Sequence, residues 1–155
     1  MFYTFIASKL DYCNSILNGL PNNTLEFLVR AQKAAGRLIS NKTVFQHISP
    51  VMKDLHWFPI KKGLEYKIVV LTFKCVHNLA PTYLTEFLHN RTSKGTRADN
   101  QNLLVVPEVK KSTFGGRSIS FTAPFLSNQL PNHLRHASRL EIFKKNLKTH
   151  LFTKI

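Results

Sequence analysis

Apolar residues recur at intervals of three and four along most of this chain, and this spacing predicts a mainly helical fold. The pattern begins in residues 2–18, and Pro21 follows the end of this predicted helix. It returns in residues 23–39, where Asn23 and Glu26 have the spacing of a capping box. We therefore expect a bundle of helices in the N-terminal part of the chain.

The predicted helix 23–39 carries its polar residues in one narrow stripe. Its apolar side chains cover about 220° of a helical wheel, so we expect this helix to be buried on most sides. The remaining arc holds Glu26, Arg30, Lys33 and Arg37. This stripe is either a solvated face or a face that contacts phosphates, and the pattern alone leaves both interpretations open.

Residues 60–79 contain the longest apolar stretch of the chain. Its β-branched residues are compatible with a strand, but a segment of this length with Gly63 as its one breaker favours a helix. A helix that is apolar nearly all round belongs in the middle of a core. Lys67 and Lys74 form its polar edge, and Trp57 is predicted to be a core anchor rather than a base-stacking platform.

The segment after this helix is polar and then weakly alternating. Residues 90–102 have no periodicity and form the predicted linker. The apolar run 103–107 and the alternating residues 117–122 are typical of two short strands, which predicts a small β-hairpin. The basic residues in and beside its turn are Lys110, Lys111 and Arg117.

The last segment predicts an amphipathic helix. Ser138 and Glu141 have the spacing of a capping box, and apolar residues at helical intervals follow them. Beside this apolar stripe lie Lys144, Lys145 and Lys148. The predicted fold is therefore mainly α, with a helical bundle-like N-terminal part, a small β-hairpin and a C-terminal amphipathic helix.

The charge balance points to an anionic partner. The 155 residues include 22 Lys and Arg against 8 Asp and Glu, which gives a net charge of +14. This balance suits the backbone of RNA or DNA, although a solvated basic surface that only keeps the chain soluble would have the same composition. Residues 101–155 alone carry +7.

Length and composition exclude several classes. The length is that of about one domain, which argues against a multidomain machine, and 43% hydrophobic residues are too many for a disordered tail. No apolar run approaches the roughly 18 residues of a membrane span, so we expect no membrane partner. Cys13 and Cys75 form no disulfide framework, which favours a reducing intracellular compartment, the nucleus or the cytoplasm.

No catalytic or cofactor motif is recognisable. The eight carboxylates include no DxD or adjacent Asp pair of the kind that holds two Mg²⁺ ions, and phosphate-binding loops are absent. His133 and His136 are three residues apart but lack a third ligand at a useful spacing. We expect no cofactor, no metal site and no enzymatic activity.

Several blocks of the chain are recognisable in order. They are SKLDYCNS at 8–15 with GLP at 19–21, RAQKAAGRL at 30–38, HISPV at 47–51 with DLHWFP at 54–59, and HNLAPTYL at 77–84. These blocks resemble, in the same order, the C-terminal thumb and post-thumb region of reverse transcriptases from non-LTR (LINE-type, jockey-like) retrotransposons. Residues 103–107, 113–115 and 143–152 also fit. The resemblance therefore extends over nearly the whole chain.

The resemblance implies a fragment of a polymerase. In that family these blocks lie downstream of the palm, and the aromatic-Ala-Asp-Asp signature that binds the catalytic metals has no counterpart here. It implies a helical thumb-like region in residues 1–89, a linker in 90–102 and a basic hairpin plus helix in 103–155. Because Met1 begins inside a family block, we expect a truncated copy of an element.

Two departures from the family pattern concern packing. Gly36 replaces a usual Ala, which weakens a helix slightly. Ser127 stands where the family usually has Trp, and we expect this change to loosen the C-terminal core.

The sequence thus predicts a non-catalytic C-terminal fragment of an RNA-directed DNA polymerase that at most contributes RNA or DNA backbone binding. The candidate contacts are Arg30, Lys33, Arg37, Lys67, Lys74, Lys110, Lys111, Arg117, Lys144, Lys145 and Lys148. The alternative is a protein–protein interaction module or a non-functional helical remnant. Removal of a palm domain would expose the apolar N-terminal helix Phe2–Leu17, which predicts self-association.

Overall fold

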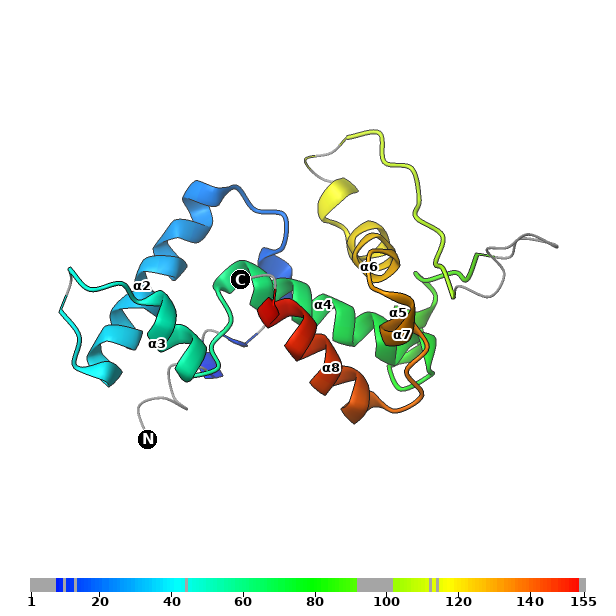
Figure 1. Ribbon diagram of the computed structural model, residues 1–155. Helices are drawn as coiled ribbons and strands as arrows, with labels where there is room; N and C mark the ends of the chain where they lie inside the picture. Colours follow the sequence, from blue (N-terminus) through cyan, green and yellow to red (C-terminus); the bar gives the residue numbers. More distant parts are fainter. Residues whose placement is uncertain are drawn as a thin grey trace. The chain divides into compact units, whose positions relative to one another are not determined.

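The computed structural model describes residues 8–9, 11–12, 14–43, 45–91, 102–111, 113 and 115–153. Their secondary structure is helical, which confirms the mainly α prediction (Figure 1). In chain order the helices are η1 (Asn14–Leu17), α2 (Asn22–Ser40), α3 (Ser49–Asp54), α4 (Ile60–Val76), α5 (Thr82–Thr85), η3 (Gly115–Arg117), α6 (Ile119–Asn128), α7 (Asn132–Arg135) and α8 (Leu140–Thr153). None of these described helices is long and apolar enough to cross a membrane.

The chain divides into two compact units, Met1–Leu64 (unit 1) and Glu65–Ile155 (unit 2). The division falls inside α4, the helix predicted from the long apolar stretch. The predicted linker 90–102 lies mostly outside the described residues. Each unit is therefore described by its own packing.

Unit 1 has two apolar clusters. The first contains Ala35 of α2, Val51 and Met52 of α3, and Ile48 and Trp57. Trp57 is only 6% exposed, which confirms its predicted role as a core anchor. The second contains Leu25 of α2 with Ile60 and Leu64 of α4.

A buried amide ties α2 to the segment before α4. Gln32 is 7% exposed, and its Nε2 donates to the backbone carbonyl of Phe58 at 2.7 Å. A buried polar group costs stability unless it is hydrogen-bonded, so this bond favours one position of the segment against α2.

The capping box predicted at the start of α2 does not form. The helix begins at Asn22 after Pro21, so Asn23 already lies in the first turn, and its Oδ1 accepts from the adjacent N–H of Thr24. Glu26 pairs with Arg30 instead. Of the predicted helix 2–18, residues 8, 9 and 11 are helical and η1 follows; residues 2–7 lie outside the described part of the chain.

Three helices end in the same way. Asn41 after α2, His56 after α3 and Asn78 after α4 have positive φ angles of 53°, 53° and 56°. The next amide in each case donates to a carbonyl five residues earlier: Lys42 to Arg37, Trp57 to Met52 and Leu79 to Lys74, at 3.1, 2.8 and 2.7 Å. This is the Schellman arrangement, which satisfies carbonyls that a helix end leaves open and reverses the chain.

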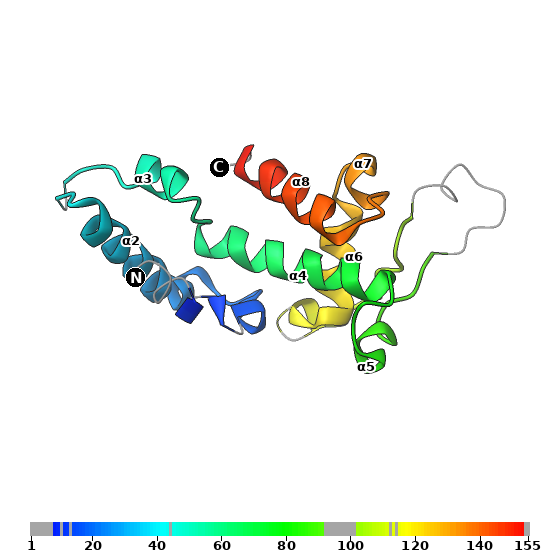
Figure 2. The same ribbon diagram turned by 90° about the horizontal axis from the view of Figure 1, so that it is seen from below.

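Unit 2 packs the second part of α4 against α8. Both views show the two helices side by side (Figures 1 and 2), and the rings of Phe73 and Phe143 stack at 4.2 Å between centroids. Phe143, Leu147 and Leu151 are buried at four-residue intervals along α8. The predicted C-terminal amphipathic helix is therefore confirmed.

The predicted β-hairpin is wrong. Arg117 belongs to η3 and residues 119–122 to α6. Ser118 between them caps α6, because its carbonyl accepts from the N–H and the hydroxyl of Thr122 and starts a helical turn. The run 103–107 is extended, but its partner is the segment 89–91: Arg91 donates to Leu103 and Val105 to His89, both at 2.8 Å. Among the described residues this pairing remains a single antiparallel bridge.

The side chain of Asn128 completes this pairing. Its Nδ2 donates to the Leu104 carbonyl and its Oδ1 accepts from the Leu104 N–H, both at 2.9 Å. One amide of α6 therefore satisfies both backbone groups of a residue that is 3% exposed, as a neighbouring strand would.

Candidate nucleic-acid interface and an adjacent pocket

The cationic stripe of α2 is only partly available. Arg30 donates from Nη2 to Oε1 of Glu26 at 2.7 Å, with the two side chains 74% and 56% exposed. An exposed pair of this spacing contributes about 0.3–0.5 kcal/mol and exchanges readily for another anion. Lys33 is exposed.

Arg37 is half-buried in the last turn of α2, where its backbone takes part in the helix cap. Its Nε is buried without a hydrogen-bond partner among the described residues, and its carbonyl accepts from the N–H groups of Asn41 and Lys42. A cation in the last turn also interacts favourably with the helix dipole. Of the three predicted contacts on α2, Lys33 is exposed, Arg30 is exposed and paired with Glu26, and Arg37 is half-buried.

The face of α2 that was expected to be buried is largely exposed. Phe27 and Leu38 are 78% and 79% exposed, and Ala31 and Ala34 between them are exposed as well. The prediction of burial on most sides is wrong, because the described clusters of unit 1 cover α2 on the side of Leu25 and Ala35 alone.

The lysines of α8 form a compact cationic face. Lys145 and Lys148 are exposed and Lys144 is half-buried, while Phe143 and Leu147 between them point into the core. Residues three and four apart on a helix have Cβ atoms about 5–6 Å from each other, so these lysines are neighbours. The structure brings these three predicted contacts together.

The other predicted contacts of unit 2 lie on separate elements. Lys67 and Lys74 are half-buried on α4, about 10 Å apart along the helix axis from their seven-residue spacing. Lys110 and Lys111 are exposed on an irregular segment, and Arg117 is exposed at the end of η3. Lys67 and Lys74 share one face of α4, whereas Lys110, Lys111 and Arg117 lie on other elements.

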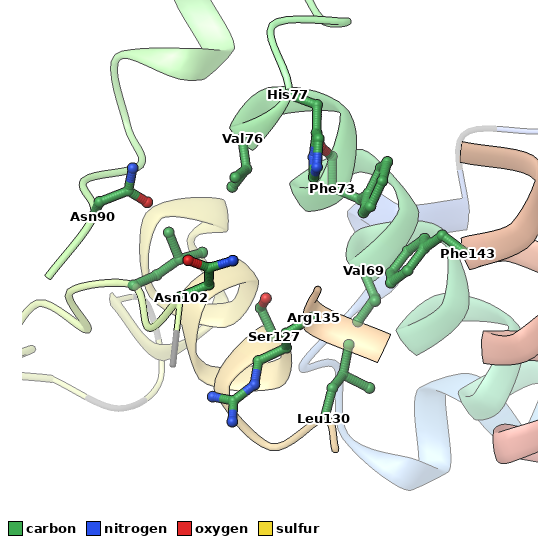
Figure 3. A pocket seen from close by; sticks show the side chains of 11 residues that line it. Val69, Phe73, Val76, His77, Asn90, Asn102, Ser127, Leu130, Arg135 and Phe143 are labelled. Atoms are coloured by element: carbon green, nitrogen blue, oxygen red, sulfur yellow. The ribbon is translucent and has the colours of Figure 1, made fainter. Parts of the chain in front are cut away.

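A cavity of about 120 Å³ lies within unit 2 (Figure 3). Its apolar wall is formed by Val69, Val76, Phe73, Leu104, Leu130 and Phe143. Three rings stack in that wall, since His77 lies on Phe73 at 3.9 Å and Phe73 lies on Phe143. The polar lining comes from Asn90, Asn102, Ser127 and Arg135, together with His77.

Arg135 is the charged group of this cavity. Its Nη2 donates to Oδ1 of Asn132, whereas its Nε and Nη1 are buried without a hydrogen-bond partner among the described residues. The lining residues include no Asp or Glu. The sequence prediction omitted both Arg135 and Ser127 as site residues; the one signal was Ser127 at a position where a Trp was expected.

The described residues offer no catalytic constellation. They contain no group of three or more His, Cys, Asp or Glu side chains placed to hold a metal ion. Cys75 is a free thiol that is 5% exposed, and burial raises its pKa, which keeps it protonated and unreactive near neutral pH.

Comparison of the chain with protein-family models, with curated proteins and with solved structures gave no match.

Proposed function

We propose that this chain is a non-catalytic module that binds the phosphate backbone of RNA or DNA, derived from the C-terminal region of a non-LTR retrotransposon reverse transcriptase. The observation that carries the binding proposal is the lysine face of α8, which lies beside a fully packed apolar stripe. Those lysines take no part in the core and are free to contact an anion.

The charge of unit 2 supports the same proposal. Residues 65–155 contain fourteen Lys and Arg against five Asp and Glu, a net charge of +9, and residues 1–64 contain eight against three. Cations on exposed helix faces supply sequence-independent contacts to phosphates and make affinity strongly salt-dependent. We therefore expect binding that tolerates any base sequence.

A salt series tests this proposal. Binding of the full chain to a fluorescent RNA–DNA duplex is measured by anisotropy from low to moderate salt. Each lost phosphate contact lowers the slope of log affinity against log salt by about one, so Lys145→Gln plus Lys148→Gln should reduce the slope by about two.

The matched control is Lys53→Gln plus Lys61→Gln, which removes the same charge from exposed positions of unit 1. It should leave the slope nearly unchanged. Equal slopes for the two double variants would mean that binding reflects net charge and not the α8 face. Nucleotide incorporation by the purified chain would contradict the non-catalytic part of the proposal.

The proposed origin has a separate test. The genomic sequence in frame upstream of the Met1 codon should encode the aromatic-Ala-Asp-Asp signature of the polymerase palm. Its absence from intact copies of the same element would contradict the origin without affecting the binding experiment.

A second candidate function is self-association through α2. Phe27, Ala31, Ala34 and Leu38 are exposed at intervals of four, three and four. In an antiparallel pair of α2 helices this order is self-complementary: Phe27 faces Leu38 of the second copy, and Ala31 faces Ala34. Small central residues permit close approach, and a two-fold interface uses the same patch twice.

The contact expected from the sequence was the helix Phe2–Leu17. Most of its apolar positions lie outside the described residues, although Tyr12 and Ile16 within it are exposed. We therefore propose the α2 face as the contact instead. Sedimentation equilibrium should show a dimer that Phe27→Ser plus Leu38→Ser dissociates. The control Tyr83→Ser plus Phe87→Ser changes exposed aromatic residues of unit 2 and should leave the dimer intact.

A further inference from the structure

We propose that the cavity of unit 2 binds a small organic carboxylate, with its carboxylate at Arg135 and its apolar body on the apolar wall of the cavity. The proposal is independent of nucleic-acid binding, since it concerns different residues from the lysine face of α8. It follows from the charge, the size and the lining of the cavity.

Charge selects an anion. Two nitrogen atoms of the Arg135 guanidinium are buried without a hydrogen-bond partner among the described residues, and no lining residue is acidic. Guanidinium remains protonated at any pH that a folded protein tolerates, so these two unpartnered N–H groups favour an anion that accepts from them. Asn132 accepts from the third nitrogen.

Size and lining select the body of the ligand. The cavity has a volume of about 120 Å³ and is partly open to solvent, which limits the ligand to a small apolar body with part of the molecule outside the cavity. The side chains of Val69, Leu130 and Phe143 form an apolar surface for one ring or a branched chain (Figure 3). Inorganic phosphate would pair with Arg135 and leave that surface uncovered, which is why a carboxylate on an apolar body fits better.

Ser127 is the residue that keeps the cavity open. It projects from α6 into the lining, and its hydroxyl is a donor for the second carboxylate oxygen. A large side chain at this position would fill the same space. Position 127 therefore gives a variant that closes the cavity and leaves Arg135 in place.

The test uses benzoate and benzyl alcohol as probes of the full chain. The two have nearly the same shape, and only benzoate carries a charge. Methyl NMR spectra follow Val69, Leu104 and Leu130, which report on the cavity directly. A hydrogen bond to a charged group favours binding by at least tenfold, so benzoate should bind about tenfold or more tightly than benzyl alcohol.

Two variants and one control show whether Arg135 and the cavity cause the preference for benzoate. Arg135→Met keeps the length of the side chain and should remove the preference for benzoate, while Ser127→Trp should abolish binding of both probes. Arg139→Met makes the same charge change at an exposed position outside the cavity and should leave the preference intact.

A peptide ending in Phe distinguishes the two sources of such a carboxylate. If the peptide with a free C-terminus binds more tightly than benzoate and its amide does not, the cavity takes chain termini; if benzoate binds more tightly, it takes free acids. Equal affinity for benzoate and benzyl alcohol, an unaltered preference in Arg135→Met, or methyl shifts outside the cavity alone would overturn the proposal.

Discussion

Gly36 lies in the middle of α2 on its buried side. A Cβ atom there would lie 3.4 Å from Cδ1 of Ile48 and 3.5 Å from Sδ of Met52, which are the ends of flexible side chains. Gly36→Ala should therefore raise the free energy of unfolding by about 0.5–1 kcal/mol, because Ala has the higher helix propensity and loses less backbone freedom. Urea unfolding followed by fluorescence of Trp57 measures the change.

Gly115→Ala provides the contrast. At that position a Cβ atom would lie 2.9 Å from Cβ of Val109, which is closer than carbon atoms pack. The same substitution should therefore lower stability there. If both variants shift the urea midpoint in the same direction, the space around each glycine does not determine whether Ala stabilises or destabilises the fold.

Cys75 should make stability depend on pH in the alkaline range. Burial raises its pKa above the usual value of about 8.5, so the unfolded chain loses this proton first. The thiol then contributes full stability below pH 8.5, and this contribution decreases as pH rises through the folded pKa. In a Cys13→Ser background, Cys75→Ala should remove that decrease.

Thiol reactivity gives an independent measurement on Cys75. At pH 8 the Cys13→Ser variant should react slowly with a disulfide reagent, at a rate that urea increases together with unfolding. A reaction as fast as that of a free thiol in the folded state would show that Cys75 is accessible.

The helices were largely predictable because their signal is local. The periodicities that gave α2, α4 and α8 follow from which side chains share a face, and that depends on neighbours three and four residues away. The burial of α2 was overestimated because periodicity shows which residues are apolar, not how many neighbours cover them. Phe27 and Leu38 have apolar side chains but no covering helix within the described clusters.

The β-hairpin prediction was wrong because the pairing of these residues is not local. A run of five or six residues contains too few periods to distinguish strand from helix. The backbone groups of Leu104 are bonded by the side chain of Asn128, and its neighbours Leu103 and Val105 pair with Arg91 and His89, all distant in the sequence. The cavity of unit 2 was also not predictable, since its lining comes from several helices and from the 89–91 pairing. The cationic residues were predictable, and so was the grouping of three of them on α8, because the helix itself was predicted from its periodicity.

The end of α2 should respond to substitution in a characteristic way. Asn41 is exposed and has a φ of 53°, a conformation that Gly adopts without strain and that β-branched residues resist. We expect Asn41→Gly to be neutral or stabilising by up to about 1 kcal/mol, and Asn41→Val to cost about 1–2 kcal/mol. Thermal unfolding of the native chain and the two variants measures the order of their stabilities. An Asn41→Val variant more stable than Asn41→Gly would contradict the left-handed conformation at position 41.

At the level of the whole molecule, α4 belongs to both units. Ile60 and Leu64 enter a core of unit 1, and Phe73 packs on Phe143 in unit 2. A helix of this length divided in two leaves pieces too short to be stable alone. Disruption of its middle should therefore reduce order in both units.

Lys67→Pro tests this consequence. It removes a hydrogen bond inside α4 and should cost about 3 kcal/mol or more. We expect Trp57 emission from unit 1 to shift to longer wavelength, and the Leu147 methyl signals of unit 2 to lose their dispersion. Lys61→Pro, in the first turn where Pro is tolerated, is the control. Retention of either signal in Lys67→Pro would mean that the two units fold independently.

Deamidation of Asn128 would change the packing of unit 2. Side-chain amides hydrolyse slowly to carboxylates, and the product here would keep the acceptor for the Leu104 N–H but lose the donor to the Leu104 carbonyl. A negative oxygen would then face that carbonyl at close range. A single deamidation in storage would thus detach residues 103–105 from α6 and open the cavity wall that Leu104 forms.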